Sequence, residues 1–382
     1  MIYLDNSATT KPHKEVLDTF VQVNESFYAN PSSIHQAGVE ANTLLDRARS
    51  QIADILHTEE QFVLFTAGGT ESNNFAIFGV PKANTHKGKH IITTEIEHAS
   101  ILEAVKSLEQ EGYEIDFLKV DENGVISLQE LQDKLRKDTV LVSMMHVNNE
   151  MGAIQPIEEA ATIIHENSRA TFHVDAVQSF GKLPIAFNED AGPDIISISG
   201  HKIHALKGSG IIAFRKKMNI IPLLLGGGQE KGLRSGTVAV PQAVAIAKAA
   251  RLATQNMEQR NAEYRKWHND LLEFLAGFGE SIHLLSTKTG APHILSFSVK
   301  DLKGEVLINA LQKRGIIVST SSACSSKQKK TSHVVEALDI HSNYKKGVIR
   351  LSFGAFNTQD DIREFKKVFT DVMKELKGDK NK

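Results

Sequence analysis

The sequence is poor in cysteine, with Cys324 as the single example among 382 residues. A lone thiol excludes an internal disulfide and a metal site built from several cysteines, and it suits a reducing compartment. The motifs H-E-x-x-H and Cys-x₂-Cys are also missing, so no metal site is expected and a zinc hydrolase is a weak alternative. The thiol lies in the polar stretch "STSSACSSKQKK", and these polar neighbours favour a functional thiol over a buried structural one.

An excess of one charge and long apolar runs are missing as well. Lys and Arg total 44 and Asp and Glu total 46, so the net charge of −2 offers no field that would recruit nucleic acid or an anionic membrane. The apolar run "NIIPLLLGGG" is far shorter than the roughly 20 residues of a bilayer span. The start "MIYLDNSATT" lacks the regions of a signal peptide. We therefore expect a cytoplasmic protein without a direct nucleic-acid or membrane partner.

From about residue 16 to residue 214, short apolar segments alternate with amphipathic ones. Amphipathic segments at 99–110, 127–137 and 157–167 have helical character. This alternation predicts an α/β fold, with a mainly parallel seven-stranded sheet covered by helices on both faces. Ligands of such sheets bind beyond the carboxyl ends of the strands. The runs that read as strands, rich in Ile, Val and Phe, are 61–67, 89–94, 113–120, 139–146, 171–177, 194–199 and 208–214.

The span 242–276 contains neither proline nor glycine and predicts one long helix that joins two domains. Beyond it, apolar runs at 293–299, 315–320 and 348–353 and helical patterns at 305–314 and 362–376 predict a smaller α+β domain. We expect a large domain over 13–255. The small domain would comprise 1–12 and 256–382 and carry the cysteine loop at about 319–331.

Polar groups follow three of the predicted strands. In "FTAGGTESNN", glycines before a helix would let backbone N–H groups approach a phosphate, or would simply form a turn capped by Thr70. Asp175 ends a buried strand and needs a cation, either the nitrogen of a cofactor or a local Arg or Lys. Lys202 in "SGHK" could form a Schiff base or be a solvated turn residue. Together, the three features are those of a site for pyridoxal 5′-phosphate (PLP).

The motifs extend this interpretation to a family. The chain resembles the NifS-like (group I) cysteine desulfurases of the class V aminotransferase family, which are PLP enzymes of fold type I, from Tyr3 to about Thr358. The motifs that carry the resemblance, in order along the chain, are "YLDNSATT", "ANPSSIHQAG", "FTAGGTESNN", "EIEHAS", "HVNNEMGAIQP", "HVDAVQS", "SGHKIHALKGSG", "GGGQEKGLRSGT", "SSACSS" and "IRLSFGAFNT".

The resemblance implies a role in cofactor binding for each matching residue. Lys202 would hold the cofactor covalently and later act as the base at the substrate Cα. Asp175 would keep the pyridine nitrogen protonated, and Gln178 would hydrogen-bond the ring oxygen. Thr237 would reach the phosphate from the other subunit, which implies a homodimer. The remaining cofactor contacts would come from Gly69, Thr70, Asn149, Ser199 and His201.

The resemblance also implies a reaction. His98 would stack on the pyridine and assist proton transfers, and Asn149 and Arg350 would bind the carboxylate of L-cysteine. Cys324 would attack the substrate sulfur, which leaves a persulfide and releases L-alanine; the nearby lysines at 327, 329 and 330 would favour its thiolate. The sulfur acceptor would be a tRNA sulfurtransferase or an iron–sulfur scaffold. Alternatives are a selenocysteine lyase, an aminotransferase or a catalytically silent partner in sulfur-carrier assembly.

Overall fold

The computed structural model of the chain describes residues 1–187, 192–320 and 332–378. Cys324 and most of the predicted cysteine loop lie outside these ranges. None of the helices in the described ranges combines the length and the apolar composition that a membrane crossing requires.

The larger sheet has seven strands, as the sequence predicts. β8 runs antiparallel to both of its neighbours, and the other strands are parallel to one another. The predicted mainly parallel sheet is therefore confirmed. In spatial order the strands are β2 (Val63–Thr66), β8 (Gly210–Phe214), β7 (Ile195–Ser199), β6 (Thr171–Asp175), β5 (Thr139–Met145), β3 (His90–Thr94) and β4 (Glu114–Leu118).

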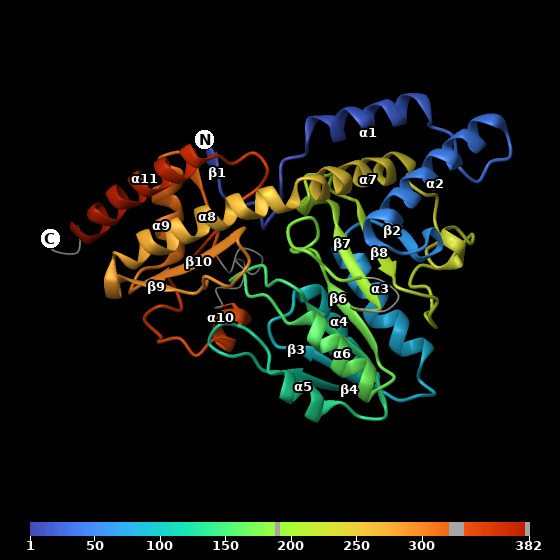
Figure 1. Ribbon diagram of the computed structural model, residues 1–382, viewed down its shortest axis with the longest axis horizontal. Coiled ribbons are helices and arrows are strands. Elements are labelled where there is room, and N and C mark those ends of the chain that lie inside the picture. Colours follow the sequence, from blue (N-terminus) through green and yellow to red (C-terminus); the bar gives the residue numbers. More distant parts are fainter. Residues whose placement is uncertain (188–191, 321–331, 379–382) are drawn as a thin grey trace.

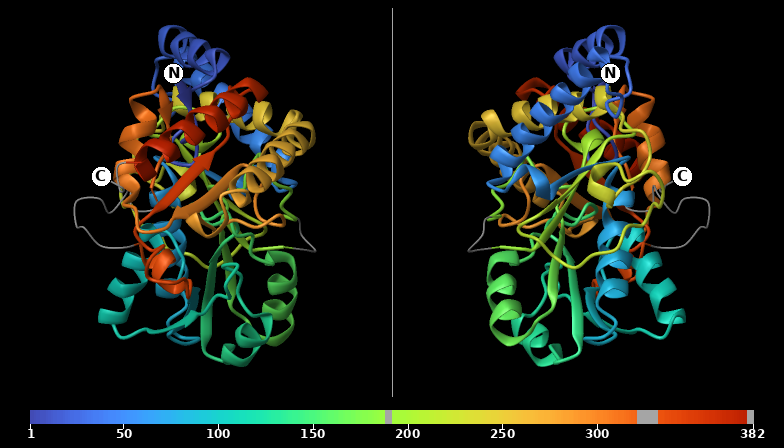
Figure 2. Two further views of the ribbon diagram at one scale, coloured as in Figure 1. Left: turned by 90° about the vertical axis from the view of Figure 1, so that its left-hand side faces the viewer. Right: turned by 90° about the vertical axis from the view of Figure 1, so that its right-hand side faces the viewer.

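Both faces of this sheet are buried. Successive side chains of a strand point to opposite sides, and each side packs into its own core. Ile91 of β3 packs into a core on one face and Ile92 into a core on the other, and both are fully buried. Figure 2 shows helices on the two sides of the sheet. α3 (Gly69–Ala83) and α4 (Ala99–Gln110) contribute to the first core. The second core receives α1 (Lys14–Ser26), α2 (Gln36–Leu56), α5 (Leu128–Lys134), α6 (Ile157–Asn167) and α7 (Val240–Gln255).

The prediction of one helix over 242–276 is wrong, because the segment forms two helices. α7 ends at Gln255, α8 (Met257–Ala276) begins two residues later, and Asn256 between them has a non-helical backbone (φ −124°, ψ 27°). Asparagine is a weak helix former. The break also allows each helix to face its own core. α7 packs on the large sheet, whereas α8 buries Trp267 in a separate core with β9 and β10. Figure 1 shows α7 beside the large sheet and α8 continuing towards β9 and β10.

A third core, separate from the two on the large sheet, lies around α8, where Trp267, Phe297 and Phe369 are almost fully buried. Its antiparallel sheet has the order β12 (Val348–Ser352), β10 (Ile294–Val299), β9 (Ile282–Leu284), and β1 (Ile2–Tyr3) pairs in parallel with β11 (Ile316–Ile317). We propose that the domains divide near residue 256, with the N-terminal segment joining the smaller one. Besides α8, the described part of the smaller domain contains the helices α9 (Gly304–Gln312), α10 (His333–Ala337) and α11 (Gln359–Gly378). The described ranges of the chain also contain the short 3₁₀ helices η1 (Glu60–Phe62), η2 (Gly200–Lys202), η3 (Glu230–Gly232) and η4 (Gly279–Ser281).

Candidate active site

Several of the predicted site residues lie at one edge of the large sheet. The strands β2, β3, β5, β6 and β7 all point the same way, so the segments that follow them meet at one edge. This edge is where open parallel sheets bind ligands. The residues that end these strands or follow them closely are Gly69, His98, Asn149, Asp175 and Lys202.

A groove of about 610 Å³ lies at the N-terminus of α3. The N-cap is Gly68, not Thr70, and its φ of 153° suits glycine. A β-carbon on Gly69 would lie 2.8 Å from Val177 Cγ2 and 3.3 Å from Ser199 Cβ, so only glycine fits without a shift. Helix N–H groups and a positive dipole end at this groove suit a phosphate. Its lining includes Gly68, Gly69, Thr70, Ser199 and His201, four of which the resemblance assigns to the cofactor.

His201 is a neutral member of this groove. Burial is the main cause that lowers the pKa of His201 to about 4, and the positive charge of Lys202 is the next largest. The Nδ1 atom of His201 lies 3.2 Å from the hydroxyl oxygen of Thr9. It therefore offers hydrogen bonds at neutral pH and no positive charge. Thr237 is exposed and is not among the residues that line the groove of its own chain. Its contact from a second subunit stays a prediction.

Asp175 has amide partners instead of a basic side chain. Asn73 Nδ2 donates to Asp175 Oδ2 at 2.8 Å, and the Val177 N–H donates to Oδ1 at 2.9 Å. Within the described ranges, no ion pair joins this almost buried carboxylate to Arg or Lys. A buried carboxylate without a cation of its own fits the protonated nitrogen of a pyridine ring.

A hydrogen-bond chain connects Asp175 with His98. The amide of Asn73 that binds Asp175 also donates to Ser100 Oγ at 3.0 Å, and this oxygen lies 2.8 Å from His98 Nδ1. The backbone N–H of Ser100 donates to the same Nδ1 at 3.1 Å. Because a backbone N–H can only donate, Nδ1 is an acceptor and the neutral ring carries its proton on Nε2. Burial lowers the pKa of His98, which favours this neutral form.

Lys202 and Gln178 both contact the N-terminal segment. Lys202 Nζ donates to the carbonyl oxygens of Ser7 and Ala8, the latter at 2.8 Å. Gln178 Nε2 donates to Ser7 O at 3.0 Å, whereas its buried Oε1 has no partner within the described part of the chain. Buried polar atoms are normally hydrogen-bonded, so an unpartnered one at this edge fits a site for a polar ligand.

Arg350 and Asn149, the predicted carboxylate-binding pair, are brought together by the structure. The Arg350 side chain is buried, and its Nη1 donates to the Asn149 carbonyl oxygen at 2.8 Å. Its Nη2 lies 2.9 Å from Asp5 Oδ1, an ion pair that the sequence analysis missed. The Nε atom has no partner among the residues described.

The residues that flank the segment 321–331 are anchored at the same edge. The backbones of Ser319 and Arg350 exchange hydrogen bonds of 3.2 and 2.8 Å. On the other flank, Ser332 Oγ donates to Glu150 Oε2 at 2.6 Å, and burial raises the pKa of Glu150 to about 7. His333 Nε2 lies 2.9 Å from the carbonyl oxygen of Glu97, the residue before His98. The residues on both flanks of the segment that contains Cys324 are therefore anchored beside the candidate site.

Sequence reasoning missed Asn73, Ser100, Asp5 and Glu150, although each lies within or beside a motif it quoted. Asn73 and Ser100 belong to "FTAGGTESNN" and "EIEHAS", and Asp5 belongs to "YLDNSATT". These motifs mark the segments that build the site, but they do not tell which of their polar residues contact one another.

The fold and the site geometry define a PLP-dependent enzyme of fold type I. Residues 2–365 match the model of the aminotransferase class-V family, and the chain belongs to this family. It is 41% identical to a "NifS/IcsS protein homolog" of Lactobacillus delbrueckii subsp. bulgaricus, over 97% of both chains. It is 40% identical to "Cysteine desulfurase IscS" of Methanosarcina thermophila, over 99% of this chain and 93% of that one.

Solved structures give the same result. The structure titled "NIFS-LIKE PROTEIN" superposes with a TM-score of 0.91 at 35% identity and covers 98% of this chain and 99% of its own. "SspA in complex with cysteine" has a TM-score of 0.81 at 30% identity and covers 94% of this chain and 100% of its own. The predicted resemblance to the NifS-like proteins is confirmed.

Proposed function

We propose that the protein is a PLP-dependent cysteine desulfurase, which converts L-cysteine to L-alanine and passes the sulfur to Cys324 as a persulfide. One observation carries the proposal. A groove suited to a phosphate, a buried acid without a basic partner among the described residues, a lysine amine and a buried arginine meet at one sheet edge, in a chain about 40% identical to named cysteine desulfurases.

At this edge of the sheet, some residues would bind the cofactor or the substrate and others would transfer protons. Bound PLP supplies an electron sink that makes the substrate Cα proton acidic. The N-terminus of α3 would hold the phosphate, Asp175 would face the ring nitrogen, and Lys202 Nζ would take the Cα proton. Arg350 would bind the substrate carboxylate through its guanidinium fork, in competition with Asp5.

The sulfur step requires a thiolate and a proton donor. When the Cys324 thiolate attacks the substrate sulfur, an S–S bond forms and the Cβ–S bond breaks. The electron pair of the broken bond stays with the carbon skeleton, which takes up a proton on the way to alanine. His98 is suited to proton transfer because its Nε2 carries the exchangeable proton while Nδ1 is held by Ser100.

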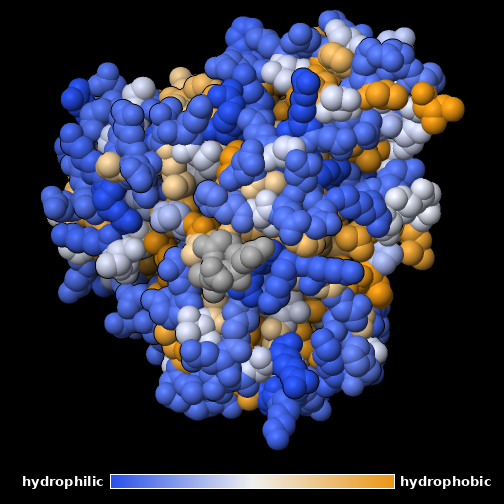
Figure 3. Space-filling view, turned by 45° about the vertical axis from the view of Figure 1, so that its right-hand side comes forward, coloured by the Kyte–Doolittle hydropathy of each residue, from blue (hydrophilic) through white to orange (hydrophobic). Residues whose placement is uncertain are grey.

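We also propose that two copies of the chain pair and that the sulfur leaves to an acceptor protein. Large apolar residues are exposed in the loop after α1 and in the segment after β8, with Ile34 99% exposed and Tyr28 and Leu225 each 83% exposed. Figure 3 shows apolar side chains at the surface on the side that carries these segments in Figure 1. Exposed apolar groups of this kind support a protein interface. A scaffold for iron–sulfur assembly and a tRNA sulfurtransferase are the two proposed acceptors.

The test measures alanine released from L-cysteine in the presence of a thiol reductant. We expect Lys202→Ala to abolish both alanine release and the absorbance of bound PLP, and Cys324→Ala to abolish release and keep the absorbance. Lys216→Ala is the matched control, because Lys216 is exposed and follows β8, whose reversed direction places it at the opposite sheet edge. Its activity should equal that of the wild type.

Two results would overturn the proposal. One is unchanged PLP absorbance in Lys202→Ala, and the other is full alanine release by Cys324→Ala. Competition between L-cysteine and L-selenocysteine separates the desulfurase from a selenocysteine lyase. Mass spectrometry of acceptor proteins after incubation with isotopically labelled cysteine distinguishes the two proposed acceptors.

A further inference from the structure

His204 lies two residues after Lys202, at the end of the turn formed by residues 200–204, which we call the lysine turn. The N-terminal segment binds both main-chain groups of this histidine. The His204 N–H donates to Thr10 Oγ1 at 2.8 Å, and the His13 N–H donates to the His204 carbonyl oxygen at 3.0 Å. The lysine turn is therefore attached to the start of the chain at the residue where the turn ends.

The backbone of His204 has an uncommon conformation, with a φ of 62° in the left-handed region. Residues other than glycine adopt this region rarely and at a cost in energy, and such positions concentrate at functional sites. Next to it, the Ala205 N–H donates to the Gly200 carbonyl oxygen at 3.0 Å, which closes the lysine turn. The surroundings of His204 therefore have to maintain the conformation of the turn that carries the lysine.

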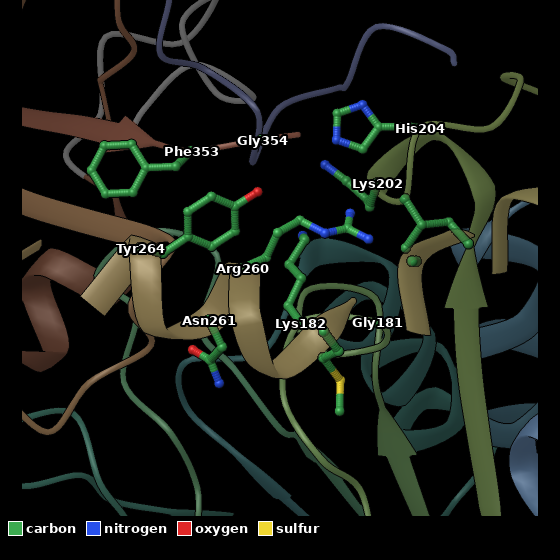
Figure 4. A pocket seen from close by; sticks show the side chains of 12 residues that line it. Gly181, Lys182, Lys202, His204, Arg260, Asn261, Tyr264, Phe353 and Gly354 are labelled. Carbon is green, nitrogen blue, oxygen red and sulfur yellow. The ribbon is translucent and has the colours of Figure 1, made fainter. Parts of the chain in front are cut away.

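The side chain of His204 makes a hydrogen bond from each ring nitrogen. Nδ1 donates to the Lys11 carbonyl oxygen at 2.7 Å, because a carbonyl oxygen can only accept, and Nε2 accepts from the Ala355 N–H at 3.0 Å. Burial lowers the pKa of His204 to about 3, so the ring is neutral and Nε2 stays an acceptor. Lys202, His204 and Gly354, the residue before Ala355, line the same small cavity (Figure 4).

Two other rings hold the buried ring of His204 in place. The His13 ring lies 4.8 Å away between centroids, and the Phe356 ring lies 5.3 Å away in an edge-on arrangement. Ala355 comes three residues after the end of β12, the strand that contains Arg350. The His204 ring therefore connects the lysine turn to the chain that continues from the Arg350 strand.

We propose that His204 is a positioning residue that fixes Lys202 relative to Arg350, so that Lys202 Nζ is aligned with the substrate Cα proton. The inference rests on the proposed function, since it adds a residue to the same reaction. Arg350 would hold the substrate carboxylate, so the distance from Nζ to Cα depends on how the two segments are aligned. A small misplacement of reacting groups is enough to slow a reaction strongly. In this role His204 acts through Lys202 and transfers no proton itself.

The experiment measures exchange of the Cα hydrogen of L-alanine with D₂O by NMR, with the PLP-loaded protein. This exchange requires proton transfer at Cα and no transfer of sulfur, so it reports on Lys202 independently of Cys324. Each rate is divided by the concentration of bound PLP, measured by its absorbance. A variant that only loses folded protein therefore keeps the wild-type rate per site.

Two variants remove the contacts of the His204 ring by different routes. His204→Phe keeps an aromatic ring and removes both side-chain hydrogen bonds. Ala355→Pro removes only the N–H that binds Nε2, at the second position of a turn in which the Asn357 N–H donates to the Gly354 carbonyl oxygen at 3.0 Å, a position that favours proline. With about a fivefold effect for each lost hydrogen bond, exchange should slow about 25-fold in His204→Phe and about fivefold in Ala355→Pro. The half-saturating alanine concentration should change little, because Arg350 keeps its contacts.

His90→Phe is the matched control. His90 is also buried with both ring nitrogens engaged, at 2.8 Å from Thr139 Oγ1 and 3.0 Å from Asp116 Oδ2, but it begins β3 at the opposite edge of the sheet. Its exchange rate per bound PLP should equal that of the wild type. Deuterium exchange of the backbone amides of residues 200–206, followed by mass spectrometry, gives a readout without turnover. These amides should exchange faster in His204→Phe and at the wild-type rate in His90→Phe.

Unchanged alanine exchange in both His204→Phe and Ala355→Pro, or an equal loss in His90→Phe, would overturn the inference. If His204→Phe fails to fold, Ala355→Pro decides the matter with His204 intact. Failure of the proposed function has a different signature, because the wild type itself would then bind no PLP or exchange no Cα hydrogen. That result would remove the inference together with the function on which it rests.

Discussion

The ion pair between Arg49 and Glu230 offers a quantitative test of how the chain positions the segment before Thr237. Arg49 Nη2 lies 2.6 Å from Glu230 Oε1 and Nη1 lies 2.8 Å from Oε2, with side-chain exposures of only 8% and 1%. Glu230 Oε2 also accepts from the Phe65 N–H at 3.1 Å. The pair therefore attaches η3, at the centre of "GGGQEKGLRSGT", to α2 and to β2, the strand that leads to the groove at the N-terminus of α3.

Removing one partner should lower the free energy of unfolding strongly, because the charge of the other partner stays buried. Arg49→Met leaves the Glu230 carboxylate with the backbone N–H of Phe65 and no ion-pair partner among the described residues, and such losses cost about 3–5 kcal/mol. The entropy of unfolding of a chain of this length is roughly 0.8 kcal/mol/K. The melting temperature should therefore fall by about 4–6 °C. Replacing both partners by methionine removes both charges, so the double variant should be more stable than either single variant.

Urea unfolding of the wild type, Arg49→Met, Glu230→Met and the double variant gives the coupling free energy as a double-mutant cycle. Lys14→Met is the control, because the Lys14–Asp18 pair is 85% and 61% exposed and should contribute less than about 1 kcal/mol. A cost below about 1 kcal/mol for Arg49→Met, or a double variant as unstable as the sum of the single variants, would refute the reasoning.

Two further predictions concern the residues around His98. Burial raises the pKa of Glu97 from 4.5 to about 8, so the folded state holds an extra proton between these values. The free energy of unfolding of the wild type should therefore fall from about pH 5 to about pH 8 relative to Glu97→Gln, and parallel pH profiles in urea unfolding would contradict this. Ser100→Ala removes the hydroxyl between Asn73 and His98; a lost hydrogen bond of ~1 kcal/mol should lower kcat about fivefold with little change in KM. Ser100→Thr, which keeps the hydroxyl, should retain kcat, and a loss in both variants would point to a packing effect instead.

Much of the large sheet could be predicted because its strands are buried on both faces and its helices are amphipathic. The helical patterns over 99–110 and 157–167 coincide with α4 and α6, whose apolar residues recur on one side. The break at Asn256 could not be predicted in the same way. The segment on both sides of Asn256 has alanine and polar residues and no proline or glycine. The helix breaks there because α7 packs into one core and α8 into another.

The site could be predicted as a set of segments but not as a set of contacts. Asp175 ends β6 and Lys202 follows β7, and the rule that strand ends meet at one edge places them together. The Asn73–Ser100 hydrogen bond joins two helices, and the Arg350–Asp5 pair joins residues 345 positions apart. Periodicity contains no information about which polar side chains meet across such separations.

The Asp5–Arg350 pair gives a counter-ion to a guanidinium that is only 5% exposed and that we propose binds the substrate carboxylate. A buried arginine without an anion would destabilise the fold, whereas the Asp5 carboxylate neutralises it at 2.9 Å. A substrate carboxylate has the same chemistry, so its net gain is the difference between two similar ion pairs. The same N-terminal segment receives hydrogen bonds from Lys202 and Gln178 at Ser7 and Ala8. The N-terminal segment therefore contacts both Arg350, through Asp5, and Lys202, through Ser7 and Ala8.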